Sequence, residues 1–236
     1  MRYGSWIEPR SALFHDRIDA GRQLAGALKE YSRRSDVIVL ALPRGGVPVA
    51  SEVAAALEAE LDVLIVRKLG YPGNEEFAVG AIASGGITVL NERIHLPSAE
   101  LQSIVDNESR ELQRREQAYR GNRPDPDLRG RCVILVDDGL ATGSTMRAAI
   151  AAVRRRQAGS VVVAVPVAPS TTISQIGQEA DSVVCLHLPE DFAGIGQFYV
   201  DFSQTTDDVV RELLKSAWAR FSKAPRRVSD AARFER

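Results

Sequence analysis

The sequence predicts an α/β fold of three layers, in which a mostly parallel central sheet carries helices on both faces. Continuous apolar runs at residues 37–42 and 132–136 lack polar alternation, which is typical of strands buried on both faces. Segments with helical periodicity separate such runs, as expected for crossover connections between parallel strands. The length of 236 residues suits one domain of this class.

The elements follow in chain order from their boundary signals. Asp16 is placed to cap a first helix, and Pro43-Arg44-Gly45-Gly46 ends the first strand before an alanine-rich helix. Ser84-Gly85-Gly86 is flanked by two short apolar runs, which predicts a hairpin. We expect buried strands at residues 37–42, 62–67, 132–136, 161–167 and 182–188, and helices at residues 16–31, 46–60, 98–120, 144–157, 170–178 and 205–221.

We expect a single domain over residues 1–221. A small hood from about residue 189 to 204 would lie beside an N-terminal arm of residues 1–15, and a basic tail would follow at 222–236. The first residues have no signal-peptide pattern and no apolar run approaches about 18 residues, so we expect a cytoplasmic protein without a membrane span. The net charge of -1 gives no reason to expect a nucleic-acid partner.

The most informative stretch is VILVDDGLATGST, which occupies residues 133–145. A strand leads into a glycine-containing turn that opens a helix, and the free N–H groups of a helix start form an anion site. Residues 141–145 (Ala141, Thr142, Gly143, Ser144 and Thr145) combine small side chains with hydroxyl donors, which suits a phosphate monoester. The stretch matches neither G-x-x-x-x-G-K-[ST] nor G-x-G-x-x-G.

Two acids, Asp137 and Asp138, stand directly before this anion loop. Carboxylates would repel a phosphate that touched them, so they must face a part of the ligand that carries hydroxyl donors. A ribose 5-phosphate meets both demands, with its phosphate in the loop and its 2′- and 3′-hydroxyls on the acids. The simpler alternative, a cap on the following turn, explains one acid but leaves the second unexplained.

With these residues the sequence resembles the type I phosphoribosyltransferase family, whose signature is four apolar residues, two acids, small residues and then Thr-Gly-Gly/Ser-Thr. The resemblance implies phosphoribosyl pyrophosphate as ligand, together with Mg²⁺, with the acids on the ribose and the loop on the 5-phosphate. It also implies that a nitrogen base displaces pyrophosphate at C1 of the ribose. We expect no direct protein ligand for Mg²⁺, which reaches Asp137 and Asp138 at most through water.

Two further strand ends carry cations. The resemblance implies a pyrophosphate loop at Arg44, Gly45 and Gly46, where the alternative is an ordinary strand-to-helix turn. Arg67 and Lys68 are placed to neutralise the leaving pyrophosphate, and the alternative is a solvated pair of cations. The turn-rich residues 69–77 that follow correspond to the family's flexible loop, which closes over the site and excludes water.

The acceptor base stays open. Phe192, Phe198 and Tyr199 are candidates for stacking on a base, and the alternative is ordinary packing. Enzymes of this family that act on 6-oxopurines usually place a lysine after the strand that follows the phosphate loop, whereas residues 161–181 contain neither Lys nor Arg. This weakens a hypoxanthine or guanine assignment.

The sequence therefore predicts a Mg²⁺-dependent phosphoribosyltransferase of nucleotide salvage, which we expect to form a homodimer. One alternative is a regulator that binds phosphoribosyl pyrophosphate or a nucleotide without chemistry. Another is the partner domain of a hydrolase in a larger fusion, for which the sequence offers no catalytic nucleophile. The three histidines are scattered, so we expect neither a zinc site nor a histidine triad.

Overall fold

The computed structural model describes residues 12–71, 74–90, 94 and 96–223. Most of the expected N-terminal arm and basic tail lie outside these residues. The elements in chain order are α1 (Arg17–Ala27), η1 (Lys29–Tyr31), β1 (Val37–Ala41), α2 (Gly46–Leu57), β2 (Glu60–Val63), β3 (Val66–Tyr71), β4 (Asn74–Ala83), β5 (Ile87–Leu90), α3 (Ser98–Arg120), β6 (Cys132–Val136), α4 (Ser144–Arg155), β7 (Ser160–Val167), α5 (Ser170–Ile176), β8 (Ser182–His187), η2 (Ile195–Phe198) and α6 (Asp207–Lys223).

The central sheet has five parallel strands in the order β2-β1-β6-β7-β8. Its strands are buried on both faces, and successive residues of β1 enter different cores: Val37, Val39 and Ala41 pack on one side, Ile38 and Leu40 on the other. This division follows from the two-residue repeat of a strand. The continuous apolar runs of the sequence are therefore explained by helices on both faces.

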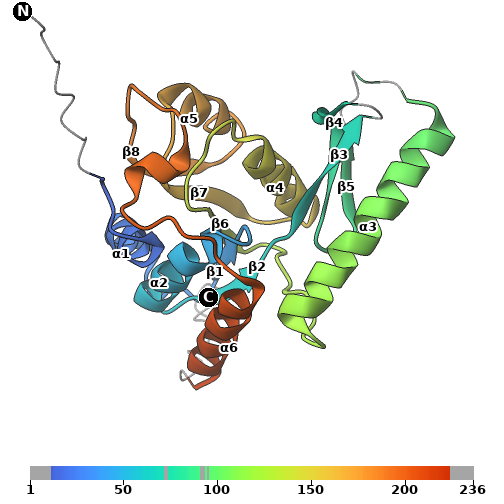
Figure 1. Cartoon of the computed structure of the whole chain (residues 1–236). Coiled ribbons are helices and arrows are strands. Elements are labelled where there is room, and N and C mark those ends of the chain that lie inside the picture. Colours follow the sequence, from blue (N-terminus) through green and yellow to red (C-terminus); the bar gives the residue numbers. More distant parts are fainter. Residues whose placement is uncertain (1–11, 72–73, 91–93, 95, 224–236) are drawn as a thin grey trace, which may run out of the picture.

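The helices form the two outer layers, which confirms the predicted three-layer α/β fold. Residues of α1, α2 and α6 belong to one apolar cluster with the sheet, and residues of α4 and α5 belong to the other. Figure 1 shows the first group below the sheet and the second above it. Asp16 caps α1 as expected, since its Oδ1 accepts a hydrogen bond of 2.8 Å from the N–H of Asp19.

Beside this body lies a second unit made of β3, β4, β5 and α3, which we call the arm and which is distinct from the N-terminal segment. Its first strand differs from the strand that the sequence predicts. The run at residues 62–67 is not one buried strand, because β2 ends at Val63 and β3 begins at Val66 in a second sheet of order β3-β4-β5. The chain turns at residues 64–65, where the N–H of Ile65 donates to Ser84 Oγ at 3.0 Å. Both sides of the break are apolar, so the run contains no local signal for it. Figure 1 shows the second sheet leaning against the long helix α3.

Buried charges join the arm to the body. Asp62 of β2 is fully buried, and its Oδ1 accepts a hydrogen bond of 2.7 Å from Arg120 Nε at the end of α3. The same guanidinium contacts the Val63 carbonyl and Asp125. Burial raises the pKa of Asp62, and Arg120 opposes that rise. The end of α3 is thus fixed to the edge of the central sheet by a network of desolvated charges rather than by apolar packing alone.

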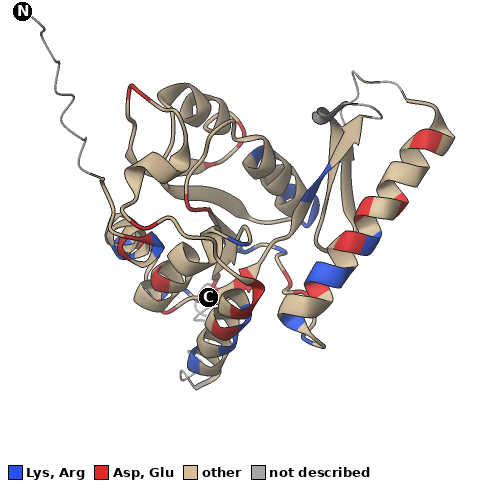
Figure 2. Ribbon diagram, in the orientation of Figure 1, with Lys and Arg blue, Asp and Glu red and all other residues tan. Residues whose placement is uncertain are grey.

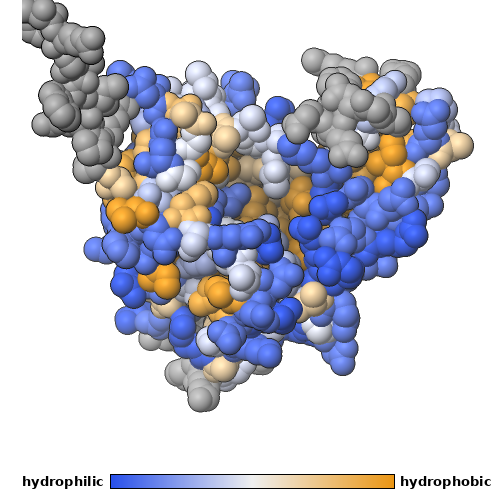
Figure 3. All heavy atoms as spheres, in the orientation of Figure 1, coloured by the Kyte–Doolittle hydropathy of each residue, from blue (hydrophilic) through white to orange (hydrophobic). Residues whose placement is uncertain are grey.

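The surface of the described chain is largely hydrophilic in the view of Figure 3. Figure 2 shows acidic residues in the upper part of α3 and a mixture of acidic and basic residues in its lower part. None of the helices in the described part of the chain is long and apolar enough to cross a membrane. Cys132 is buried and Cys185 is partly buried, and both are free thiols.

Arg120→Met is expected to destabilise the fold by about 3–5 kcal/mol, because Asp62 would remain as a buried charge without its main partner. Urea unfolding followed by circular dichroism measures the difference. The matched control is Arg34→Met, which breaks a surface ion pair with Asp36 and is expected to cost less than about 1 kcal/mol. Equal effects of the two substitutions would contradict a structural role for the buried network.

Candidate active site

Two loops meet where neighbouring strands of the central sheet end. β1 and β6 are paired in parallel with Ala41 opposite Val136, and the N–H of Leu42 donates to the Val136 carbonyl at 2.9 Å. The turn at residues 43–46 therefore lies beside the loop at residues 137–145. Strand order reverses between these two strands, because β2 lies outside β1 and β7 lies outside β6. Ligands of open α/β sheets bind at such a switch point.

The two glycines of the first turn are required by this close approach. A Cβ on Gly45 would collide with Asp138 Oδ2, and a Cβ on Gly46 would lie 2.7 Å from the Val136 carbonyl oxygen. Every other amino acid would push the first turn away from the acids. The pair of glycines thus brings the backbone of one loop into contact with the carboxylates of the other.

The acid pair lies in a desolvated position. Asp138 is buried, Asp137 is partly buried, and the N–H of Asp138 donates to Asp137 Oδ1 at 2.9 Å. Burial, together with the neighbouring charge of Asp138, raises the pKa of Asp137 well above its ordinary range. Burial also raises the pKa of Asp138, and an ion pair with Arg17 opposes that rise. Ionisation of these two carboxyl groups therefore lowers the stability of the fold.

Arg17 is a site residue that sequence reasoning missed. Its Nε donates to Asp138 Oδ2 at 2.7 Å, with both side chains about one-tenth exposed. The only local signal is its position at the first residue of α1, where the positive end of the helix dipole disfavours a cation. An arginine at this unfavourable position suggests that an acidic residue elsewhere in the chain compensates, but the sequence does not show which one.

The anion loop has the expected form. Gly143 precedes α4 with φ of 71°, a left-handed conformation that favours glycine, and a Cβ there would also meet Thr172 at 2.9 Å. Thr142 and Ser144 have hydroxyl groups 3.2 Å apart and are exposed, as is Ala141, while Thr145 is partly buried in the first turn of α4. The free N–H groups of a twelve-residue helix therefore open toward solvent beside the acid pair.

The structure separates the expected cations of the pyrophosphate side. Arg44 lies in the turn after β1, partly exposed and 3.8 Å from Asp207 of α6. Arg67 does not end a core strand but lies in β3, where its Nε donates to Glu108 of α3 at 2.7 Å. Lys68 follows on the opposite face of β3 and is exposed. Arg67 and Lys68 thus point in different directions, and among the described residues no carboxylate pairs with Lys68.

The residues expected to form a flexible loop lie mostly in strands. Tyr71 of β3 pairs with Asn74 of β4, so the hairpin continues almost to its tip. Residues 72–73, and the side chains of Glu75 and Glu76, lie outside the described part of the chain. The expectation of closure over the site stays a prediction.

Residues 189–204, which we expect to act as a hood, contain η2, and two of the three candidate aromatic residues there are buried. Phe14 and Tyr199 form a parallel bridge that joins the N-terminal segment to the hood. Phe198 and Tyr199 are buried in one cluster with Phe14, which corresponds to the packing alternative. The Tyr199 hydroxyl donates to the Asp138 carbonyl at 2.6 Å, so this ring supports the acid loop. Phe192 is partly exposed, 5.4 Å from Phe198, and alone of the three keeps accessible surface for a base.

Comparison with known proteins places this geometry in a family. The profile of the phosphoribosyl transferase domain matches residues 11–203, which include both loops and the hood. The chain belongs to the phosphoribosyl transferase family. This phosphoribosyl transferase domain is 47% identical over 216 residues to a Mycobacterium tuberculosis protein named "Putative phosphoribosyl transferase Rv0571c", a match that covers 90% of the chain and 48% of that protein. The chain therefore spans about half the length of the curated relatives it matches.

A solved structure shows the same fold. The crystal structure of TT1426 from Thermus thermophilus superposes with a TM-score of 0.79 at 43% sequence identity. The match covers 86% of this phosphoribosyl transferase domain and 98% of the Thermus chain. The overall fold is thus shared with an experimentally determined protein.

Gly45→Ala is expected to weaken binding of phosphoribosyl pyrophosphate by at least tenfold, because the new methyl group would displace the Asp138 carboxylate. Calorimetric titration of the ligand with Mg²⁺ measures the loss. Gly26→Ala is the matched control, since a Cβ there meets nothing within 4 Å and alanine in a helix interior adds stability. Wild-type affinity in Gly45→Ala would show that the close approach is not needed for the site.

Asp137→Asn is expected to stabilise the protein at pH 8. Because the pKa of Asp137 is higher in the folded state than in the unfolded state, ionisation of this group costs stability as the pH rises through the folded pKa. The gain should therefore shrink as the pH falls toward about 4, the ordinary carboxyl range. The difference in melting temperature between Asp137→Asn and the wild type, followed across this pH range, measures the gain. A shift of about 2–4 °C is expected for each kcal/mol of added stability.

The control is Asp36→Asn, which is expected to change the melting temperature in the opposite direction. The hydrogen bond from Arg34 lowers the pKa of Asp36, so loss of this charge should slightly lower the melting temperature at pH 8. A lower melting temperature of Asp137→Asn at pH 8 would contradict the proposed cost of the acid pair.

Proposed function

We propose that this protein is a phosphoribosyltransferase that transfers the ribose 5-phosphate of phosphoribosyl pyrophosphate to a nitrogen base and releases pyrophosphate, in the manner of nucleotide salvage. The observation that carries the proposal is the contact between the glycine turn at residues 43–46 and the acids Asp137 and Asp138, directly before the helix start of α4. Membership of the phosphoribosyl transferase family supports it.

The anion loop and the acid pair divide the ligand between them. A phosphate monoester on the N–H groups and hydroxyls of residues 141–145 receives charge-assisted hydrogen bonds and the positive end of the α4 dipole. The ribose hydroxyls then donate to Asp137 and Asp138, whose desolvated position strengthens each hydrogen bond. Since the acids take no part in phosphate binding, both parts of a ribose 5-phosphate find complementary groups.

The reaction is a substitution at C1 of the ribose. The bond from C1 to the pyrophosphate oxygen breaks with its electron pair leaving on the pyrophosphate, and a nitrogen lone pair of the base forms the new bond to C1. A base nitrogen that carries a proton loses it to solvent. The negative charges of Asp137 and Asp138 favour the positive charge that develops at C1, and Arg44 and Lys68 are the candidates to receive the leaving pyrophosphate.

The residues present fit a Mg²⁺ ion that arrives with the ligand. No group of three or more metal-binding side chains occurs among the described residues, so a cage made of protein alone is not offered there. Mg²⁺ commonly keeps several waters and is held by one or two carboxylates together with substrate phosphates. Asp137 and Asp138 supply such carboxylates, through water, and the bound ion would neutralise charge on the pyrophosphate.

A regulator that binds phosphoribosyl pyrophosphate without chemistry is the second candidate. Two observations favour it. Arg67 is ion-paired with Glu108 and so is not free for pyrophosphate, and the rings of Phe198 and Tyr199 are buried in the hood and so are not free for a base. In the structure as it stands, only Phe192 among the three expected aromatic residues has surface for a base. Both candidates share the same ribose 5-phosphate site and differ in whether a base can react there.

A screen of nitrogen bases with phosphoribosyl pyrophosphate and Mg²⁺ tests the proposal, with release of pyrophosphate as the measured signal. We expect turnover with at least one base, and a decrease of at least tenfold in kcat for Asp138→Asn, which retains shape but loses the charge near C1. Ligand binding should weaken less than kcat, because the amide oxygen still accepts one hydrogen bond.

The matched control is Asp36→Asn, an exposed acid whose kcat should equal that of the wild type. Tight binding of phosphoribosyl pyrophosphate without turnover for any base would select the regulator. A protein that binds neither phosphoribosyl pyrophosphate nor ribose 5-phosphate would overturn both candidates.

A further inference from the structure

We propose that Arg17 is a positioning residue of the ribose site, which fixes the Asp138 carboxylate and ties the hood to it. The inference rests on the proposed function, since it concerns the acid that would hold the ribose. It adds a residue that lies outside the motif at 133–145 and about 120 positions before the acid in the chain.

Toward the acid, Arg17 completes a set of contacts that leaves Asp138 little freedom. Its Nε donates to Oδ2 at 2.7 Å, Gly45 packs against the same oxygen, and the Tyr199 hydroxyl donates to the Asp138 main-chain carbonyl at 2.6 Å. Side chain and backbone of Asp138 are therefore held from different segments of the chain. Such fixation is what a hydrogen-bond acceptor needs if it is to meet a ribose hydroxyl without reorganisation.

Toward the hood, the same guanidinium makes two further contacts. Its Nη1 donates to the Ser203 carbonyl at 2.8 Å, and its central carbon lies 3.9 Å from the centre of the Phe202 ring. Phe202 in turn lies 5.0 Å from Tyr199, and a Cβ on Gly196 would meet the Phe202 ring at 2.9 Å. The Arg17 side chain thus links Asp138 to Phe202 and Ser203 of the hood.

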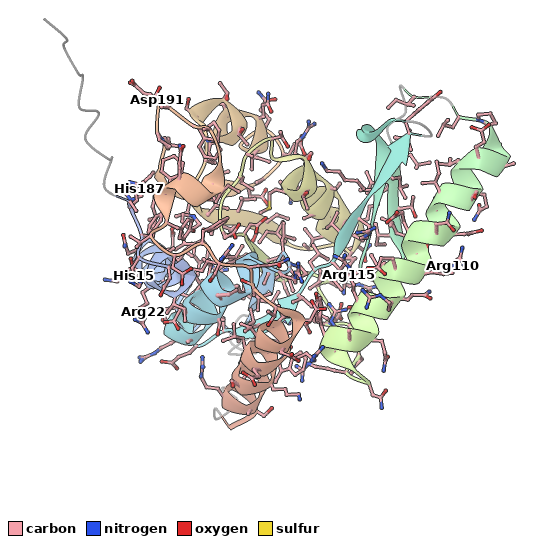
Figure 4. All side chains as sticks on the ribbon, in the orientation of Figure 1. His15, Arg22, Arg110, Arg115, His187 and Asp191 are labelled. Carbon is pink, nitrogen blue, oxygen red and sulfur yellow. The ribbon has the colours of Figure 1, made fainter. Side chains whose placement is uncertain are left out.

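Arg17 differs in this respect from the neighbouring cation of the same helix. Arg22 pairs with Glu52 of α2 at 3.0 Å, and its side chain is 69% exposed, against 12% for Arg17. Figure 4 shows Arg22 on the outer side of α1, across the molecule from Arg110 and Arg115 of α3. The buried guanidinium is therefore a specific feature of the first turn of α1 and not a general property of its cations.

A double-mutant cycle between Arg17→Gln and Asp138→Asn tests the inference, with the affinity for phosphoribosyl pyrophosphate and Mg²⁺, and for ribose 5-phosphate alone, measured by calorimetry. Arg17→Gln is expected to weaken binding roughly tenfold. In the Asp138→Asn background the same substitution should change the affinity less than about twofold, because Arg17 acts through Asp138. Additive effects, unchanged affinity or tighter binding in Arg17→Gln would each overturn the inference.

Hydrogen exchange of the hood gives a readout that a general loss of stability would not produce. In Arg17→Gln the amides of Val200 and Asp201, which donate to Phe14 and His15, should exchange at least tenfold faster. Amides of β6 should keep wild-type rates, and Arg22→Gln should change neither set. Equal acceleration in the hood and in β6 would indicate global destabilisation and would overturn the link between Arg17 and the hood.

Arg17→Lys separates the two contacts and guards against a variant that fails to fold. Lysine retains a positive charge for Asp138 but lacks the planar fork that also reaches Ser203 and stacks on Phe202. We expect affinity within about threefold of the wild type together with faster exchange in the hood. If Asp138→Asn leaves the affinity unchanged, the proposed ribose site and this inference both fall; if it weakens binding while Arg17→Gln does not, only the inference falls.

Discussion

The close approach of two loops at the ends of β1 and β6 is the constraint on which the rest of the site depends. Gly45 and Gly46 allow the backbone after β1 to touch Asp138 and the Val136 carbonyl, at distances that a Cβ would prevent. The contact is set by the parallel pairing of the two strands, with Ala41 opposite Val136. Helices pack against both faces of this strand pair and support the position of the anion loop and the acid pair beside the turn.

The same approach places two carboxylates side by side in a desolvated position, and cations from distant segments of the chain oppose the cost. Burial and the neighbouring carboxylate raise the pKa of Asp137, while Arg17 from α1 opposes the rise at Asp138. At the edge strand β2, Arg120 does the same for the buried Asp62 and thereby fixes the arm. In both places a carboxylate is buried at the expense of its hydration, and an arginine from a helix stabilises its charge.

The hood and the arm are held in place by different interactions. The hood is an aromatic cluster of Phe14, Phe198 and Tyr199, which also supports the acid loop through the Tyr199 hydroxyl. The arm is a three-stranded sheet with α3, where Arg67 is bound to Glu108. Relatives of about twice the length contain the same domain, so the phosphoribosyl transferase fold is combined there with further chain.

The sequence by itself determined the layers of the fold, nearly every helix and strand, and the loop at residues 133–145, because periodicity and a local motif are encoded in neighbouring residues. Only the tertiary structure decided the break between β2 and β3, since residues 63–66 are apolar throughout and give no local signal. It also decided that Phe198 and Tyr199 pack in the hood, since the sequence does not tell a buried ring from one that stacks on a ligand. It also decided the pairing of Arg17 with Asp138. Contacts between residues that lie far apart in the chain depend on how the strands are ordered, and no local pattern records that order.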